Sequence, residues 1–419
     1  MTPLLAPGRV IAAGLVGLSG AVVLPVLGPA APASAEECSS SQTRYIKQAS
    51  YNLQALGFPQ AWRLNRGRGV KVAVVDSGVD VGNAHLSGAG VVAPGVSFVP
   101  GDKTGREDVL GHGTGLAGII AGRPRSDKGS ALVGAAPEAT ILPVRVFVTE
   151  RRDSTEPAPP FSPDVHRMAL GIRWAATHGA RVINVSMSTD PSNSRLPELL
   201  SAVAFARRQD IVVVASTGDS SQGSPIDQVR YPAGAPGVIG VAATNTSGVV
   251  DDWSVHTQRT DVVAPGSDVL IAYRHNGDCL AGNQHPETSW ATGYVSGLAA
   301  LLRERYPHES ADQIAYRITA SAERPREDSR DGDAGWGTIQ PYDALTMTLD
   351  PDRPGPALPG AAHPPRETAA RTALRPLASA TDPLGPARRT ALWWGLGTLA
   401  VTGVALVLRP LVSRRVRRS

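Results

Sequence analysis

Short, nearly continuous apolar segments alternate with amphipathic segments between residues 69 and 345, and this alternation constrains the fold more than any other feature. Unbroken apolar segments of this length are typical of strands that are covered on both faces. Their alternation with helical patterns predicts an α/β fold with a doubly wound, mostly parallel sheet. The expected strands are residues 70–75, 141–147, 182–187, 211–215 and 238–242, and the clearest expected helices are 165–178 and 196–208.

Three short motifs in this region carry an aspartate, a histidine and a serine, in that order along the chain. Asp76 ends the first expected strand, at the edge of the sheet where ligands of such folds bind. His112 is flanked by glycines, which allow it to begin a helix with its ring toward a cleft. Ser289 precedes an apolar helix, whose first backbone N–H groups can bind a developing oxyanion.

These three side chains suit nucleophilic catalysis. A serine hydroxyl is a weak nucleophile and needs a base, which His112 would provide before protonating the leaving group. Asp76 would fix the tautomer of His112 and stabilise its protonated form. Taken singly, the residues also fit a surface aspartate, a structural histidine and a helix-capping serine. Their combination in this order predicts a catalytic triad.

The three motifs resemble the signatures of the subtilase family of serine proteases, and the resemblance extends over about residues 60–345. It implies a subtilisin-like fold and a serine endopeptidase that acts on proteins or peptides. No cofactor is expected, and no metal-ligand spacing stands out in the sequence, although some subtilases bind calcium. The resemblance also implies that Ser186, Ser188, Ser216 and Gly218 bind the substrate. The matching segments are DSG at 76–78, GHGTGLAG at 111–118, TSWAT at 288–292, VINVS at 182–186, YPA at 231–233 and APG at 264–266.

The chain departs from the family pattern around the expected site. Asp219 stands where the family has its oxyanion-hole asparagine, Glu287 and Ser188 replace glycines, and Gly293 replaces a proline. An ionised Asp219 would repel the oxyanion, whereas a protonated Asp219 could donate a hydrogen bond to it. Two functions therefore stay open. We favour the serine endopeptidase because its triad is intact; the alternative is a weak or inactive pseudoprotease that acts as a scaffold in a secretion complex.

The two ends of the chain predict export and membrane attachment. Residues 1–35 read as a signal peptide, because an apolar run follows Arg9 and ends at the cleavage motif Ala33-Ser34-Ala35. Glycines and a proline interrupt that run, which favours removal over a retained anchor. Residues 390–408 carry no charge and are long enough to cross a bilayer, so we expect a transmembrane helix at 390–412 rather than a buried core helix. The tail at 413–419 is basic.

The expected layout comprises a signal peptide (1–35), an N-terminal arm (36–68), a protease domain (69–348), a proline-rich tether (349–389), the membrane helix and the cytoplasmic tail. This layout resembles the mycosins, the membrane-anchored subtilases associated with type VII secretion. The resemblance implies a single-pass protein of the cell membrane, with the protease domain outside the cytoplasm. Components of a type VII secretion system are its expected partners.

The distribution of charge along the chain bears on whether the protein binds nucleic acid. The net charge is +4, and five arginines fall in the last eleven residues; subtracting them leaves −1 for the rest. A nucleic-acid-binding surface is therefore not expected on the globular part.

The two cysteines, Cys38 and Cys279, are expected to form a disulfide in an exported protein, the alternative being two unpaired thiols. The bridge would tie the mature N-terminus to a loop before Ser289.

Overall fold

The computed structural model describes residues 38–149, 159–220, 226–250, 252–283 and 285–361. These residues all belong to one unit, residues 1–365. The predicted signal peptide, membrane helix and basic tail lie outside the described residues, as does the tether beyond residue 361. In the part of the chain that is described, no helix is sufficiently long and apolar to cross a membrane. The predicted domain boundaries stay predictions.

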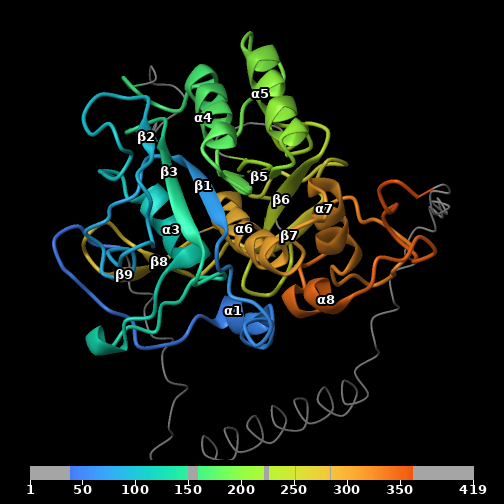
Figure 1. The fold of residues 1–419 in the computed structure, drawn as a ribbon, viewed down its shortest axis with the longest axis horizontal. Coiled ribbons are helices and arrows are strands. Elements are labelled where there is room, and N and C mark those ends of the chain that lie inside the picture. Colours follow the sequence, from blue (N-terminus) through green and yellow to red (C-terminus); the bar gives the residue numbers. More distant parts are fainter. Residues whose placement is uncertain (1–37, 150–158, 221–225, 251, 284, 362–419) are drawn as a thin grey trace, which may run out of the picture. The chain divides into compact units, whose positions relative to one another are not determined.

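A seven-stranded sheet in the order β2-β3-β1-β4-β5-β6-β7 lies at the centre of the fold (Figure 1). Every neighbouring pair in it is parallel, which confirms the predicted sheet. The five expected strands agree with the structure within two residues at each end. The strands are β1 (Lys71–Asp76), β2 (Val96–Ser97), β3 (Thr140–Arg145), β4 (Val182–Val185), β5 (Val212–Ser216), β6 (Val238–Thr244) and β7 (Val262–Pro265).

Helices cover both faces of the sheet because successive strand residues point to opposite sides. Val72 and Val74 of β1 face one core, which contains the helices α3 and α6, whereas Ala73 and Val75 face a second core with α4 and α5. In Figure 1, α4 and α5 stand together on one side of the sheet. The helices are α1 (Tyr51–Ala55), α2 (Phe58–Ala61), α3 (His112–Ala121), α4 (Val165–Thr177), α5 (Leu196–Arg208), α6 (Thr288–Arg305), α7 (Ala311–Ala320) and α8 (Pro341–Thr346), with a short 3-10 helix, η1 (Ser126–Lys128).

Helix α6 is the central helix of the first core, and its residues 288–303 are all buried. It approaches α3 closely at Gly293, where an added Cβ would lie 2.7 Å from a methyl carbon of Ile119. A larger side chain at this position would force the two helices apart. The glycine that replaces the family's proline therefore allows the two helices to pack closely.

The chain before β1 packs along the domain through main-chain and covalent contacts. Arg44 pairs with the segment before β9 (Asp278–Ala281): its N–H donates to Asn276 O at 2.9 Å, and its carbonyl accepts from Asp278 N at 3.0 Å. Cys38 and Cys279 form the predicted disulfide, with their Cα atoms 5.1 Å apart. Cys279 lies on strand β9, which pairs antiparallel with β8 (Val269–Ala272), and not in a loop as the sequence suggested.

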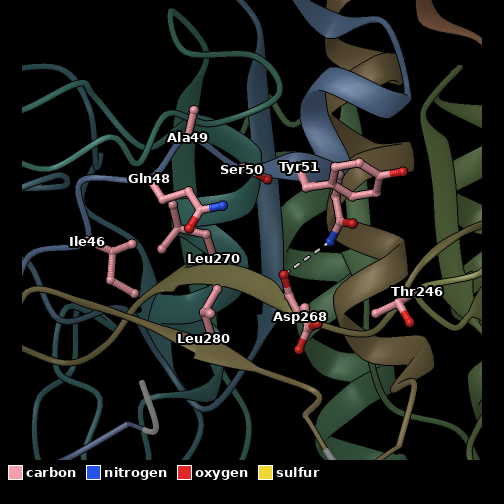
Figure 2. A pocket seen from close by; sticks show the side chains of 10 residues that line it. Ile46, Gln48, Ala49, Ser50, Tyr51, Thr246, Asp268, Leu270 and Leu280 are labelled. Atoms are coloured by element: carbon pink, nitrogen blue, oxygen red, sulfur yellow. Dashed lines mark hydrogen bonds between the residues drawn. The ribbon is translucent and has the colours of Figure 1, made fainter. Parts of the chain in front are cut away.

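A pocket of about 380 Å³ lies between this N-terminal segment and the β8–β9 pair (Figure 2). Asn52 and Asp268 both line it, and the side-chain amide of Asn52 donates to the carbonyl of Asp268 at 3.4 Å. None of Asp76, His112 and Ser289 lines the pocket. The remaining lining residues are Ile46, Gln48, Ala49, Ser50, Tyr51, Thr246, Leu270 and Leu280.

Candidate active site

Asp76 is the last residue of β1 and is completely buried. Its Oδ1 accepts from Ser77 N at 2.7 Å and lies 2.8 Å from Nδ1 of His112, and its Oδ2 accepts from the hydroxyl of Ser186. Burial alone would raise the pKa of Asp76, but the charge and hydrogen bond of His112, together with the bonds from Ser186 and Ser77, lower the pKa overall. Asp76 is therefore a carboxylate, so Nδ1 of His112 carries the proton between them.

His112 is the first residue of α3, and its side chain is 16% exposed. The residue before it, Gly111, has φ 95°, and a Cβ added there would lie 2.8 Å from the ring of Tyr273. Glycine is required at this turn for both reasons. The ring of Trp290 packs on the imidazole with 4.6 Å between ring centroids. The turn and the indole together fix the position of His112.

Asp108 organises the loop that leads to His112, although the sequence analysis did not single it out. Its carboxylate accepts hydrogen bonds from Gly111 N (2.8 Å), Thr114 N (2.9 Å), Thr114 Oγ1 (2.7 Å) and Ser77 Oγ (2.9 Å). Burial raises the pKa of Asp108 despite these bonds. In the sequence, Asp108 is visible only as an aspartate four residues before His112. That spacing does not reveal that the carboxyl group of Asp108 is buried and hydrogen-bonded.

Ser289 is the second residue of α6 and is 7% exposed. The next residue, Trp290, carries the indole that packs on His112, so the residue after the serine contacts the histidine. The structure thus brings together the carboxyl end of β1 and the N-terminal ends of α3 and α6. The N-terminal end of α6, whose first backbone N–H groups lack partners within the helix, therefore lies beside His112 and can stabilise negative charge.

Asp219 follows β5 and binds the start of α6. Its Oδ1 accepts from Thr288 N at 2.9 Å and from Thr288 Oγ1 at 3.0 Å. The residue is half-buried, and burial of its carboxyl group raises the pKa of Asp219 to about 6. The hydrogen bonds from Thr288 and the charges of His112 and Arg230 oppose this increase. At pH 7 the side chain is mostly ionised, whereas below pH 6 it is mostly a neutral acid.

The four residues expected to bind substrate lie at or just beyond the carboxyl ends of β4 and β5, which are neighbours in the sheet. Ser216 is the last residue of β5, and the other three follow β4 or β5. The hydroxyl of Ser186 donates to Asp76, and the hydroxyl of Ser216 lies 2.6 Å from that of Thr288. These two hydroxyls therefore already have partners within the protein. Gly218 has φ 97° and lies against Ser188, because a Cβ on Gly218 would be 2.5 Å from Oγ of Ser188. Their role in substrate binding stays a prediction.

Histidines and acidic groups elsewhere in the fold have structural contacts. His85 is completely buried, with Nδ1 2.7 Å from the carbonyl of Arg123 and Nε2 3.3 Å from Asp278. Within the described ranges, no group of three or more histidine, cysteine, aspartate or glutamate side chains is arranged to hold a metal ion.

Comparison with known proteins adds independent information. Residues 67–337 match the model of the subtilase family. Mycosin-3 of Mycobacterium tuberculosis is 33% identical over 366 residues, which cover 75% of this chain and 77% of that protein. Mycosin-1 of the same organism is 32% identical over 379 residues, covering 81% of this chain and 82% of that protein.

Solved structures show the same similarity. The serine protease MycP1, described as an essential component of the type VII (ESX-1) secretion system, superposes with a TM-score of 0.63 and 28% identity. The superposition covers 75% of this chain and 92% of that protein. MycP1 from Mycobacterium smegmatis gives a TM-score of 0.64 and 26% identity, covering 79% of this chain and 92% of that protein.

Proposed function

The chain belongs to the subtilase family of serine endopeptidases, and from this premise we propose that Asp76, His112 and Ser289 form the catalytic triad of an extracytoplasmic protease. Two observations support the proposal most directly: Asp76 lies 2.8 Å from Nδ1 of His112, and the imidazole of His112 packs on Trp290, the residue after Ser289.

The proposed reaction begins with attack of the Ser289 hydroxyl on the carbonyl carbon of a peptide bond. His112 takes the hydroxyl proton on Nε2 and then delivers it to the departing amine. The buried carboxylate of Asp76 stabilises the imidazolium that forms between these two steps. Water then releases the acyl group from Ser289 by the same proton transfers in reverse order.

The N-terminal end of α6 and the side chain at position 219 surround the expected position of the oxyanion. Backbone N–H groups at the start of α6 can donate to it. Oδ1 of Asp219 is occupied by Thr288, so Oδ2 is the atom that can face the oxyanion. In the ionised state Oδ2 repels negative charge, and in the neutral state it can carry a donating proton. The proposed enzyme is therefore weak at neutral pH and stronger when Asp219 is protonated.

The proposed setting is the outer face of the cell membrane, beside a type VII secretion system, with exported proteins as substrates. The similarity to the mycosins supports this setting, since MycP1 is described as a component of such a system. The disulfide between Cys38 and Cys279 also supports it, because disulfides persist in oxidising compartments. Residues 390–412 are the proposed anchor. Removing residues 390–419 is expected to release the protein from washed membranes; continued membrane attachment would contradict the anchor.

The second candidate, a pseudoprotease that acts as a scaffold, is favoured by the half-buried acidic side chain at position 219. Both candidates are tested by labelling the full chain, in detergent solution, with a fluorophosphonate probe beside a Ser289→Ala variant. Labelling of the wild type alone is expected for the protease. If a folded wild-type protein, checked by circular dichroism, shows no labelling between pH 5 and 8, the scaffold becomes the better proposal.

A further inference from the structure

A positively charged side chain, Arg230, lies beside the residues expected to bind substrate and was not singled out from the sequence. A Cβ atom added to Gly218 would lie 2.8 Å from Cδ of Arg230 and 2.5 Å from Oγ of Ser188. The stem of Arg230 therefore fills the space where the segment after β4 meets the segment after β5. Gly218 is bonded directly to Asp219, so this space adjoins the expected position of the oxyanion.

The backbone around Arg230 is held firmly against the segment after β4. Tyr231, the next residue, exchanges two hydrogen bonds with Thr189, at 2.7 and 3.0 Å. The carbonyl of Arg230 accepts from Gly234 N at 2.8 Å, which closes a turn on the other side. The backbone of Arg230 is therefore fixed, and the stem of its side chain lies against Gly218.

The guanidinium group of Arg230 makes no hydrogen bond or ion pair with any residue in the described part of the chain, and its Nε is buried. Two carboxylates lie within range of its charge. Hydrogen bonds from Ser192 lower the pKa of Asp190 most, and the charge of Arg230 adds to that effect. Arg230 likewise opposes the increase that burial causes in the pKa of Asp219. Neither aspartate forms an ion pair with it, so the guanidinium has donors available for a ligand.

A substrate would place one side chain in this region. The reacting carbonyl must lie between Ser289 and Asp219, and the Cα of the same residue is bonded to that carbonyl carbon. Its side chain therefore projects beside Gly218, which precedes Asp219 in the chain. A half-buried guanidinium without a partner is unfavourable, and a carboxylate that enters can accept two parallel N–H bonds from it.

We propose that Arg230 determines specificity at this site and selects substrates with aspartate or glutamate as the residue whose carbonyl is cleaved. The inference rests on the proposed function, since it assigns a substrate class to the same catalytic site. A hydrogen bond to a charged group contributes enough to change kcat/KM by about 10–100-fold. Cleavage after Glu is therefore expected to exceed cleavage after Gln, which has nearly the same shape, by about this factor.

The test is digestion of a proteome-derived peptide library by the full chain in detergent solution, with cleavage sites read by mass spectrometry. The wild type is expected to cleave mainly after acidic residues. Arg230→Gln is expected to lose that preference, Arg230→Lys to retain part of it, and Arg230→Glu to favour lysine and arginine. Arg208→Gln, at an exposed position of α5, is the matched control and is expected to keep the wild-type preference.

Fluorophosphonate labelling of each preparation separates failure of this inference from failure of the proposed function. If the wild type is labelled but shows no preference for acidic residues, the role of Arg230 is refuted while the protease stands. A preference that persists in Arg230→Gln also refutes it. If the wild type is neither labelled nor active, the proposed function fails, and this inference fails with it.

Discussion

Replacement of Asp219 by asparagine is expected to increase the reactivity of Ser289, and the increase is expected to depend on pH. Asparagine can keep the acceptor for Thr288 and adds an N–H donor where Asp219 has Oδ2. A single oxyanion donor contributes about 10²–10³ in kcat. The wild type has this donor only while Asp219 is protonated, and burial raises the pKa of Asp219 to about 6.

The size of the effect follows from the protonated fraction of Asp219. With a pKa of about 6, that fraction is roughly 1% at pH 8, 10% at pH 7 and 90% at pH 5. Asp219→Asn is therefore expected to react about 100-fold faster than the wild type at pH 8 and about tenfold faster at pH 7. At pH 5 the two proteins are expected to react at nearly the same rate.

The assay is the rate of fluorophosphonate labelling between pH 5 and 8, expressed as the ratio of variant to wild type. The ratio cancels pH effects that do not depend on the side chain at position 219. Asp261→Asn is the matched control: burial also raises the pKa of Asp261 to about 6, but this residue binds Gly240 N and not α6. A ratio near one at every pH would show that Oδ2 does not face the oxyanion. A large ratio without pH dependence would show that the proton of Asp219 is not the donor.

Three further expectations follow from the structure. Cys38→Ser, which breaks the bridge to Cys279 across a separation of 241 residues, is expected to lower the free energy of unfolding by about 2–5 kcal/mol in chemical denaturation; an unchanged midpoint would contradict this. Ser186→Ala removes a hydrogen-bond donor to the Asp76 carboxylate and is expected to slow labelling of Ser289 about tenfold. The variant is expected to stay folded, as checked by circular dichroism. An unchanged labelling rate would show that this hydrogen bond is not needed. Asp261→Asn is expected to stabilise the protein by about 1–3 kcal/mol at pH 8 and not at pH 4. The reason is that the pKa of Asp261 is raised in the folded protein, so the wild type loses stability as the pH rises through about 6. Equal gains at both pH values in thermal unfolding would refute the reasoning.

Local sequence patterns were enough to predict the fold class. Apolar periodicity is a property of neighbouring residues, and it placed the five expected strands and the two expected helices within two residues of their observed ends. The three short motifs likewise indicated Asp76, His112 and Ser289 as candidates, because each motif is a short segment with its own turn or helix start. The disulfide was predictable because the chain contains only two cysteines.

The properties of the site depend on contacts between residues far apart in the chain, and only the tertiary structure decided them. Ser186 lies 110 residues from the Asp76 carboxylate to which it donates, and Thr288 lies 69 residues from Asp219. The sequence left Asp219 open between an ionised and a neutral form, whereas burial in the folded protein raises its pKa to about 6. Nothing in the sequence distinguished Arg230 from the other arginines, and only the folded structure shows that it lies against Gly218. Burial and electrostatic interactions sum over all neighbours in space, and a linear pattern of residues does not specify those neighbours.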